Sequence, residues 1–458
     1  MNLDLYKHIY LIGIGGIGMS ALARYFNAKG KHVCGYDKVQ SSLCKELEDE
    51  GIKIHYSEGV EHIHQAVKKA DFNEILVIYT PAIPADNPEI NYFKDKGFKL
   101  YKRAEVLGVI SKQSFTIAVA GTHGKTTTSA ILAHLLNNSG KQVTAFLGGI
   151  SKNYNSNLLL AEKGDILIVE ADEYDRSFLQ LHPDVAIITS VDADHLDIYK
   201  DKEDLETTFV QFASQVKENG LLLVEQSIAL DFPIPENGKK LTYSASNTAD
   251  YSASNTAVRQ GKMVFDIAGL SFSKSELKFI LPGNHNISNA IAAAVVAYYS
   301  GVSTDDLAKG LSTFKGINRR FDVHINTSKI AYVDDYAHHP KEVNATINAT
   351  KQLFPKRDIT VVFQPHLFSR TQDFAQEFAI SLAGADELVL LDIYPAREKP
   401  ITGVNSEMLL SLCANPIKEV CAKQELVEVL KGKNIDVLLT LGAGDIGTLV
   451  QPIKYMLN

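Results

Sequence analysis

The stretch FTIAVAGTHGKTTT, residues 115–128, sets the architecture of the middle of the chain. Its first six residues form an apolar run typical of a buried strand, and its last residues begin a helical pattern. Between them lies a glycine-rich turn in which Lys125 and Thr126 directly follow Gly124. Such a turn can wrap backbone N–H groups around phosphate oxygens, while the lysine adds a charge and the hydroxyl suits Mg²⁺. Val119 stands where the full P-loop pattern has its first glycine, and the alternative is a lysine that merely begins a helix.

A second glycine-rich turn, GIGGIG, lies at residues 13–18. It matches GxGxxG between an apolar strand, 8–13, and a helical pattern, 19–28, and Asp37 ends the next strand. The glycines permit a tight turn, and the helix N-terminus then offers free N–H groups to an anion. An NAD-dependent oxidoreductase is one interpretation. A second interpretation is a nucleotide-sugar, whose diphosphate can bind to the same N–H groups. A third is a tight turn without a ligand.

Strand-like and helix-like patterns alternate along the chain in three series, which predicts parallel sheets. We therefore expect an α/β protein with an N-terminal Rossmann-like domain (1–105), a central P-loop ATPase-type domain (106–315) and a C-terminal Rossmann-like domain (316–458). Short alternating segments at about 240–281 predict antiparallel hairpins added to a mostly parallel central sheet. The repeat YSASNTAD/YSASNTAV (243–258) lies among them, as two similar hairpin strands or a recent duplication.

The composition agrees with this organisation. At roughly 150 residues per domain, 458 residues correspond to about three domains. The net charge of −8 and the pI of about 6.0 argue against a nucleic-acid-binding surface and favour small-molecule partners. The four cysteines include no CxxC pair, and the longest apolar stretch, 9–23, is glycine-rich and too short to span a membrane. We expect a cytoplasmic protein without membrane insertion.

Acidic residues follow two further strands of the central series. Glu170, Asp172 and Glu173 come after an apolar strand at 166–169, and the run DADHLD (192–197), with His195, follows the strand at 185–189. Because parallel strands end at one edge of the sheet, these residues should converge on the Lys125 turn. Carboxylate and hydroxyl oxygens suit Mg²⁺. The alternative is a set of solvated loop acids.

Four clusters later in the chain also stand out: GNHNISN (283–289), NRRF (318–321), DDYAHHP (334–340) and QPHLFSRT (364–371). The first caps an alanine-rich helix, which Asn residues often do. The paired histidines have no third ligand at suitable spacing, so zinc is disfavoured. An arginine such as Arg370 after a strand can hold a carboxylate with two parallel hydrogen bonds.

Taken together, these motifs resemble the Mur ligases, in family order and over nearly the whole chain. The matching stretches are GIGGIGMSALA (13–23), GTHGKTTT (121–128), VEADEYD (169–175), DADHLDIY (192–199), PGNHNISNA (282–290), RRF (319–321), DDYAHHP (334–340), FQPHLFSRT (363–371) and LGAGDI (441–446). The first glycine loop and its MSALA continuation are most similar to the alanine-adding members. The resemblance implies an ATP-dependent ligase that joins L-alanine to the lactyl carboxylate of UDP-N-acetylmuramate through an acyl phosphate, in peptidoglycan precursor synthesis.

The resemblance also implies roles for individual residues. The implied ATP-binding residues are Gly121, Thr122, His123, Gly124, Lys125, Thr126, Thr127, Asn286, Arg320 and Asp335. The implied UDP-sugar-binding residues are Gly15, Gly16, Ile17, Gly18, Ser20, Asp37, Thr80 and Ala82. The implied catalytic residues are Lys125, Glu170, His195 and Arg370, and the implied Mg²⁺ ligands are Thr126, Glu170 and His195. Arg370 is the implied holder of the alanine carboxylate.

The chain departs from the family pattern at two positions, Ser190, where the family often has Asn, and Leu367, where it often has a basic residue. The second departure leaves Arg370 as the main nearby cation for the amino acid. Three alternative functions stay open: a sister ligase that attaches a preformed muropeptide, an NAD-dependent oxidoreductase and a non-catalytic nucleotide sensor. The oxidoreductase leaves the Lys125 turn without a purpose.

Overall fold

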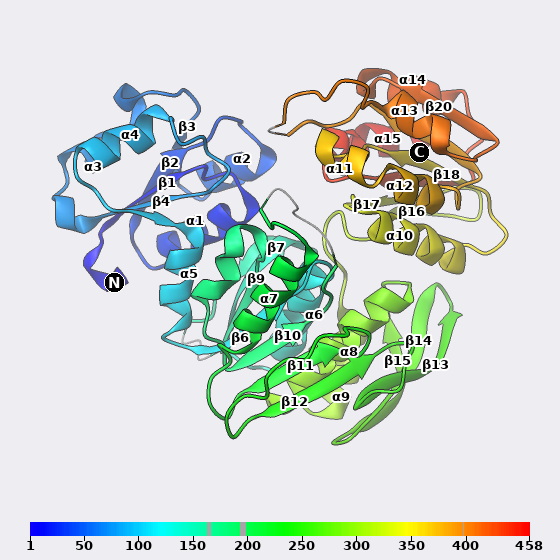
Figure 1. Cartoon of the computed structure of the whole chain (residues 1–458), viewed down its shortest axis with the longest axis horizontal. Helices are drawn as coiled ribbons and strands as arrows, with labels where there is room; N and C mark the ends of the chain where they lie inside the picture. The colour runs from blue at the N-terminus through cyan, green and yellow to red at the C-terminus, as the bar shows by residue number, and fades with distance from the viewer. Residues whose placement is uncertain (163–165, 193–197, 397) are drawn as a thin grey trace. The chain divides into compact units, whose positions relative to one another are not determined.

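The N-terminal sheet has five parallel strands in the order β3-β2-β1-β4-β5 in a computed structural model, of which residues 1–162, 166–192, 198–396 and 398–458 are described (Figure 1). Its strands are β1 (His8–Ile12), β2 (His32–Tyr36), β3 (Lys53–His55), β4 (Ile75–Tyr79) and β5 (Leu100–Lys102). Its helices are α1 (Ile17–Ala28), α2 (Ser42–Asp49), α3 (Gln65–Lys69), α4 (Pro88–Asp95) and α5 (Arg103–Ser111). The strand order reverses between β1 and β4, the position where open α/β sheets bind ligands.

The middle sheet has ten strands in the order β15-β14-β13-β12-β11-β10-β6-β9-β7-β8. Its strands are β6 (Phe115–Ala120), β7 (Val143–Ser151), β8 (Ser156–Leu159), β9 (Ile166–Ala171), β10 (Val185–Ile188), β11 (Leu221–Glu225), β12 (Lys239–Ser244), β13 (Tyr251–Arg259), β14 (Lys262–Gly269) and β15 (Ser273–Phe279). Its helices are α6 (Lys125–Asn138), α7 (Lys202–Ala213), α8 (Asn284–Tyr299) and α9 (Thr304–Thr313). The strands β6, β9, β10 and β11 are parallel, so their carboxyl ends share one edge.

The hairpins expected at about 240–281 are present in part, since β14 pairs with β15 in antiparallel fashion. A second antiparallel pair, β7 with β8, lies outside the predicted region. β12, in contrast, is parallel to β11, and its end pairs in parallel with the start of β13 through Tyr243–Tyr251 and Ser244–Ser252. These pairs join equivalent positions of the eight-residue repeat, so its copies are not two strands of one hairpin. The expectation of hairpin strands was wrong here, because alternation marks a half-buried strand without fixing its direction.

The C-terminal sheet has the order β16-β17-β21-β18-β19-β20 and is parallel except for β16. Its strands are β16 (Asp322–Asn326), β17 (Ala331–Asp335), β18 (Ile359–Phe363), β19 (Glu387–Leu391), β20 (Ile417–Cys421) and β21 (Val437–Leu441). Its helices are α10 (Pro340–Leu353), α11 (Phe368–Asp373), α12 (Ala375–Leu382), α13 (Ser406–Leu412), α14 (Leu426–Lys431) and α15 (Val450–Leu457). Three sheets of this kind confirm the predicted α/β class. The predicted domain limits stay predictions: residue 105 falls within α5, and residue 315 lies between α9 and β16.

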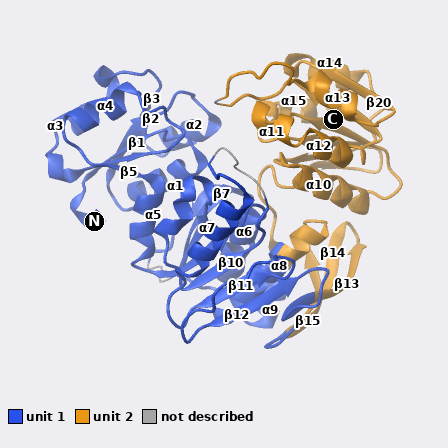
Figure 2. Ribbon diagram, in the orientation of Figure 1, with its two compact units in different colours: residues 1–252, 269–272, 289–310 blue, residues 253–268, 273–288, 311–458 orange. Residues whose placement is uncertain are grey.

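The chain divides into two compact units (Figure 2). Unit 1 comprises residues 1–252, 269–272 and 289–310, and unit 2 comprises residues 253–268, 273–288 and 311–458. Within unit 1, one hydrophobic cluster continues from α1 and α5 to β9, β10 and α7, so the N-terminal and middle sheets are packed together. No helix among the described residues is both long and apolar enough to cross a bilayer.

Candidate functional site

The turn between β6 and α6 depends on two glycines. Gly121 has a φ of 135° and Gly124 a φ of 84°, which residues with side chains rarely adopt. A Cβ on Gly121 would overlap Thr189 Oγ1, and a Cβ on Gly124 would lie 2.6 Å from Asn289 Oδ1. The backbone therefore turns tightly here, and the first N–H groups of α6, from Lys125 onward, have no partners within the helix. These groups can bind an anion.

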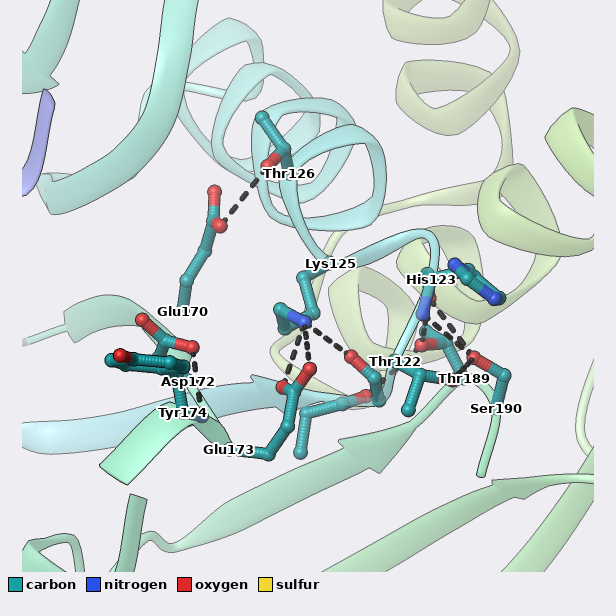
Figure 3. Close-up of polar contacts among 12 residues, drawn as sticks. Thr122, His123, Lys125, Thr126, Glu170, Asp172, Glu173, Tyr174, Thr189 and Ser190 are labelled. Carbon is teal, nitrogen blue, oxygen red and sulfur yellow. Dashed lines mark hydrogen bonds and ion pairs between the residues drawn. The ribbon is translucent and has the colours of Figure 1, made fainter. Parts of the chain in front are cut away.

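The end of β10 fixes the backbone of this turn (Figure 3). Ser190 Oγ lies 2.9 Å from Thr122 Oγ1 and accepts a hydrogen bond of 2.8 Å from the N–H of His123. The Thr189 hydroxyl donates to the Ala120 carbonyl over 3.0 Å. Ser190, the position that departs from the family pattern, thus holds the turn with a single short hydroxyl.

Lys125 begins α6, and its ammonium is paired with Glu173, as Figure 3 shows. Nζ lies 2.7 and 3.0 Å from the two carboxylate oxygens and also donates to the Gly121 carbonyl. Burial disfavours the charge, but the carboxylates of Glu173, Asp172 and Glu170 outweigh it and raise the pKa of Lys125. The carboxylates thus favour the charged form of the lysine beside the turn.

The residue after Lys125, Thr126, lies next to the carboxylate of Glu170, which gives two oxygen ligands of the kind that hard cations prefer. Thr126 Oγ1 donates to Glu170 Oε2 over 3.0 Å, and Ser129 Oγ donates to Glu170 Oε1 over 3.1 Å (Figure 3 shows the first contact). The N–H of Gly148 also donates to Glu170. Hydroxyl and carboxylate oxygens fit Mg²⁺. His195, the third predicted ligand, lies outside the described residues, among which no cluster of three or more His, Cys, Asp or Glu side chains forms a metal site.

The first glycine loop joins β1 to α1 with no cation among its own residues. The N–H of Gly15 donates to Asp37 Oδ2 over 2.8 Å, and Gly16 is the N-cap of α1. A Cβ on Gly15 would overlap Cys44 Sγ and approach Asp37 Oδ2 to 2.9 Å. Asp37 therefore contacts the loop itself, while the start of α1 at Ile17 and Gly18 provides free N–H groups.

The other predicted UDP-sugar residues of unit 1 lie next to this loop. Thr80 follows β4, with its N–H hydrogen-bonded to the Ile12 carbonyl, and Ala82 N–H is 3.5 Å from Thr80 Oγ1. Ser20 donates to the Ile17 carbonyl and accepts from Asn157, a buried residue of β8 that also donates to Ile17. A side chain of the middle sheet thus fixes the first turn of α1.

A cavity of about 320 Å³ in unit 1 is lined by residues in and around both glycine loops. From the N-terminal sheet it is lined by Gly16, Ile17, Gly18, Thr80 and Arg103, and from the middle sheet by Lys125, Gly148, Glu170 and Asp172. A ligand held at the N-terminus of α1 can therefore extend toward the lysine and the carboxylate of the second site.

Unit 2 holds three more of the predicted nucleotide-binding residues. Asp335, buried at the end of β17, accepts hydrogen bonds of 2.6 and 2.7 Å from the N–H groups of Phe321 and Ala337. Burial raises the pKa of Asp335 to about 6, although the Arg320 charge and these hydrogen bonds act in the opposite direction. Asn286 is buried in the first turn of α8 and donates to the Pro282 carbonyl over 2.8 Å.

Arg370, the predicted carboxylate holder, is buried in α11 of unit 2. Its Nη1 lies 3.4 Å from His366 Nδ1, and the ring of His366 stacks on Tyr394 at 5.7 Å. Leu367, which precedes α11, has a φ of 71°. Arg370 thus lies in the helix that follows β18, next to the imidazole of His366.

As predicted from the sheet edge, Glu170 lies near the turn: it accepts a hydrogen bond from Thr126 and lines the same cavity as Lys125. Sequence reasoning missed the roles of Glu173, Ser190 and Asn157. Glu173 belongs to an acidic cluster that was recognised after a strand, and Ser190 was recognised only as a departure from the family pattern. Their contacts with the turn are visible only in the structure. No pattern in the sequence singles out Asn157.

Comparisons with known proteins agree over the whole chain. Three family models match: the Mur ligase family catalytic domain at residues 8–115, the Mur ligase middle domain at 119–297 and the Mur ligase glutamate ligase domain at 319–444. UDP-N-acetylmuramate–L-alanine ligase of Flavobacterium johnsoniae is 48% identical, covering 100% of this chain and 99% of the relative. The same enzyme of Parabacteroides distasonis is 47% identical over 100% of this chain and 98% of the relative.

Solved structures show the same similarity. The UDP-N-acetylmuramate–alanine ligase of Thermotoga maritima matches with a TM-score of 0.81 and 27% identity, covering 97% of this chain and 98% of that one. A murein peptide ligase from Psychrobacter arcticus has a TM-score of 0.72 at 23% identity, with 98% of each chain covered, which shows the shared fold.

Proposed function

The chain belongs to the Mur ligase family, and we propose that it joins L-alanine to the lactyl carboxylate of UDP-N-acetylmuramate with ATP, in peptidoglycan precursor synthesis. The relatives of 47–48% identity carry this activity in their names. One observation supports it most: the cavity that reaches from the first glycine loop to Lys125 and Glu170. It offers a nucleotide-diphosphate site and a phosphate-binding site to one extended substrate.

We propose the following chemistry. A lactyl carboxylate oxygen attacks the γ-phosphorus of ATP, the P–O bond to ADP breaks, and an acyl phosphate forms. The alanine amine then attacks the acyl carbon, the C–O bond to phosphate breaks, and the amine loses a proton as the amide forms. Activation is required because a carboxylate repels nucleophiles and has no leaving group.

The residues of the second site serve the first step. The N–H groups at the start of α6 hold the phosphates, and Lys125 exchanges Glu173 for the transferring phosphoryl oxygens. Thr126, Glu170 and His195 are the proposed Mg²⁺ ligands, and the ion would offset phosphate charge. Asn286, Arg320 and Asp335 approach the nucleotide, and Arg370 holds the alanine carboxylate. With ATP and nucleotide-sugar as substrates, we also propose a cytoplasmic location.

An ADP-release assay with the UDP-sugar fixed tests the proposal. L-alanine should support turnover, while a muropeptide should not, and omission of the UDP-sugar should stop ADP release. Turnover with a muropeptide and not with alanine would identify the sister activity, and ADP release independent of the UDP-sugar would contradict the ligase itself. Hydroxylamine should trap a hydroxamate when alanine is omitted.

A further inference from the structure

Arg103 is a cation of the cavity that neither glycine loop contains. It is the first residue of α5 and directly follows β5, so it lies at the carboxyl edge of the N-terminal sheet. β5 pairs with β4, whose last residue precedes Thr80, another lining residue. The fold therefore places an arginine at the edge where open α/β sheets bind ligands.

The guanidinium of Arg103 lies against the first turn of α1. A Cβ built on Gly18 would come within 2.7 Å of Nη1 and 3.0 Å of Cζ. Gly18 thus leaves room for a charged side chain beside the helix N-terminus. Because the N–H groups of this turn already favour an anion, a guanidinium at the same place adds a charged, two-pronged donor.

The present partner of Arg103 is a weak one. Nη2 lies 3.2 Å from Asp172 Oδ2, and 24% of the arginine side chain and 38% of the aspartate side chain are exposed. Partly exposed ion pairs contribute little to stability. The neighbouring Lys102 is paired with Asp175, and Glu105 accepts a hydrogen bond from the Lys102 N–H. Arg103 can therefore exchange Asp172 for a ligand without leaving a buried, unpaired carboxylate, because the Asp172 side chain is partly exposed.

The helix that begins with Arg103, α5, is fixed by packing within unit 1. Val106, Leu107 and Ile110 of α5 are buried in the hydrophobic cluster of unit 1. A Cβ on Gly108 would lie 2.6 Å from the Gln180 carbonyl oxygen, so α5 packs directly on the segment that follows Glu173. The position of the guanidinium is thus set by helix packing and not by Asp172.

We propose that Arg103 binds the sugar-linked phosphate of the UDP-sugar at the N-terminus of α1 and so orients the rest of the substrate toward Lys125. This assignment rests on the proposed function, since it names a group for a phosphate that the first loop should hold. Asp172 is the resting partner, and the phosphate replaces it. Arg103 contacts substrate in this account, and Asp172 does not.

Binding of UDP and of UMP, measured by calorimetry on the full chain, tests the assignment because only UDP has the second phosphate. The wild type should bind UDP more tightly than UMP. Arg103→Ala should raise the Kd of UDP about tenfold and change the Kd of UMP little, so the preference for UDP should be lost. Arg103→Lys should restore part of this preference. Asp172→Asn should keep the preference, since it removes only the resting partner.

The outcomes separate the explanations. If Arg103→Ala keeps the preference for UDP, or if Asp172→Asn loses it as Arg103→Ala does, Arg103 acts only as an ion pair and the assignment is wrong. If the wild type binds neither nucleotide, the proposed UDP-sugar site itself fails. Circular dichroism and thermal melting of the three variants show whether any loss reflects misfolding, and Arg103→Lys keeps the test decisive if Arg103→Ala is unstable.

Discussion

The two glycine loops of unit 1 share a backbone design and differ in the side chains around it. Each joins a buried strand to a helix and leaves helix N–H groups free. The first loop is contacted by a carboxylate, Asp37, and contains no cation. The second contains Lys125 and is flanked by Glu170 and Glu173. In the proposed function, the first turn binds the nucleotide-sugar, and the second, with its lysine and carboxylates, stabilises the transferring phosphoryl group.

Lys125→Ala should give the largest effect. We expect ADP release to fall by on the order of a thousandfold, because the cation that offsets charge on the transferring phosphoryl group is lost. UDP binding at the first loop should be unchanged, which separates the two loops. Lys262→Ala, at an exposed lysine, is the matched control. Near-normal ADP release by Lys125→Ala would contradict the proposal that the second loop stabilises the transferring phosphoryl group.

Gly124→Ala and Gly15→Ala should impair different steps, ADP release in the first variant and UDP binding in the second. At Gly124 the φ of 84° and the Asn289 side chain oppose a Cβ, so ADP release should fall about tenfold to a hundredfold. At Gly15 the Cβ would displace Cys44 and Asp37, so UDP should bind less tightly while the Kd of ATP stays unchanged. The Kd of each nucleotide, with the rate of ADP release, checks this. The same profile for both variants would mean that the loops are not independent.

Glu170→Gln should raise the Mg²⁺ concentration needed for half-maximal ADP release by about tenfold, because a charged oxygen donor near Thr126 is lost. The preference for UDP over UMP should not change. Glu203→Gln, at an exposed glutamate of α7, provides the control. An unchanged magnesium requirement would remove Glu170 from the proposed ligands.

Glu173→Gln should give the smallest effect, a change in pH dependence. Burial lowers the pKa of Lys125 and the carboxylates raise it, so removal of the nearest carboxylate should lower that pKa. The lysine of the free enzyme then loses its proton at a lower pH, and the alkaline limb of the kcat/KM profile, which reports the free enzyme, should move toward neutrality. Rates measured from about pH 7 to about pH 10 check the direction. An unshifted or upward-shifted limb would contradict the pairing.

Much of unit 1 follows from its sequence. β6, β10 and the start of α6 were predicted within a residue or so, because buried parallel strands form uninterrupted apolar runs between turn residues. The meeting of Thr126 with Glu170 was predicted from the shared sheet edge, since β6 and β9 are neighbours. Regular elements and the edge they define are thus readable from a single sequence.

The unpredicted contacts come from irregular backbone or long-range packing. Glu173 lies just before a turn in which Asp175 and Arg176 have φ of 54° and 53°, and no periodicity predicts where such a turn directs a side chain. Arg103 lies two residues before the predicted domain limit at 105, yet it is the first residue of a helix, α5. Asn157 reaches α1 from 137 residues away in sequence, as its bond to Ser20 shows. These roles depend on tertiary structure.

The most direct measurement follows an oxygen atom. UDP-N-acetylmuramate labelled with ¹⁸O in its lactyl carboxylate is turned over with ATP and L-alanine, and the released phosphate is analysed by mass spectrometry. If the terminal phosphoryl group passes from the Lys125 turn to the carboxylate, one labelled oxygen must appear in each phosphate. Phosphate without label, at full conversion to the amide, would contradict the account.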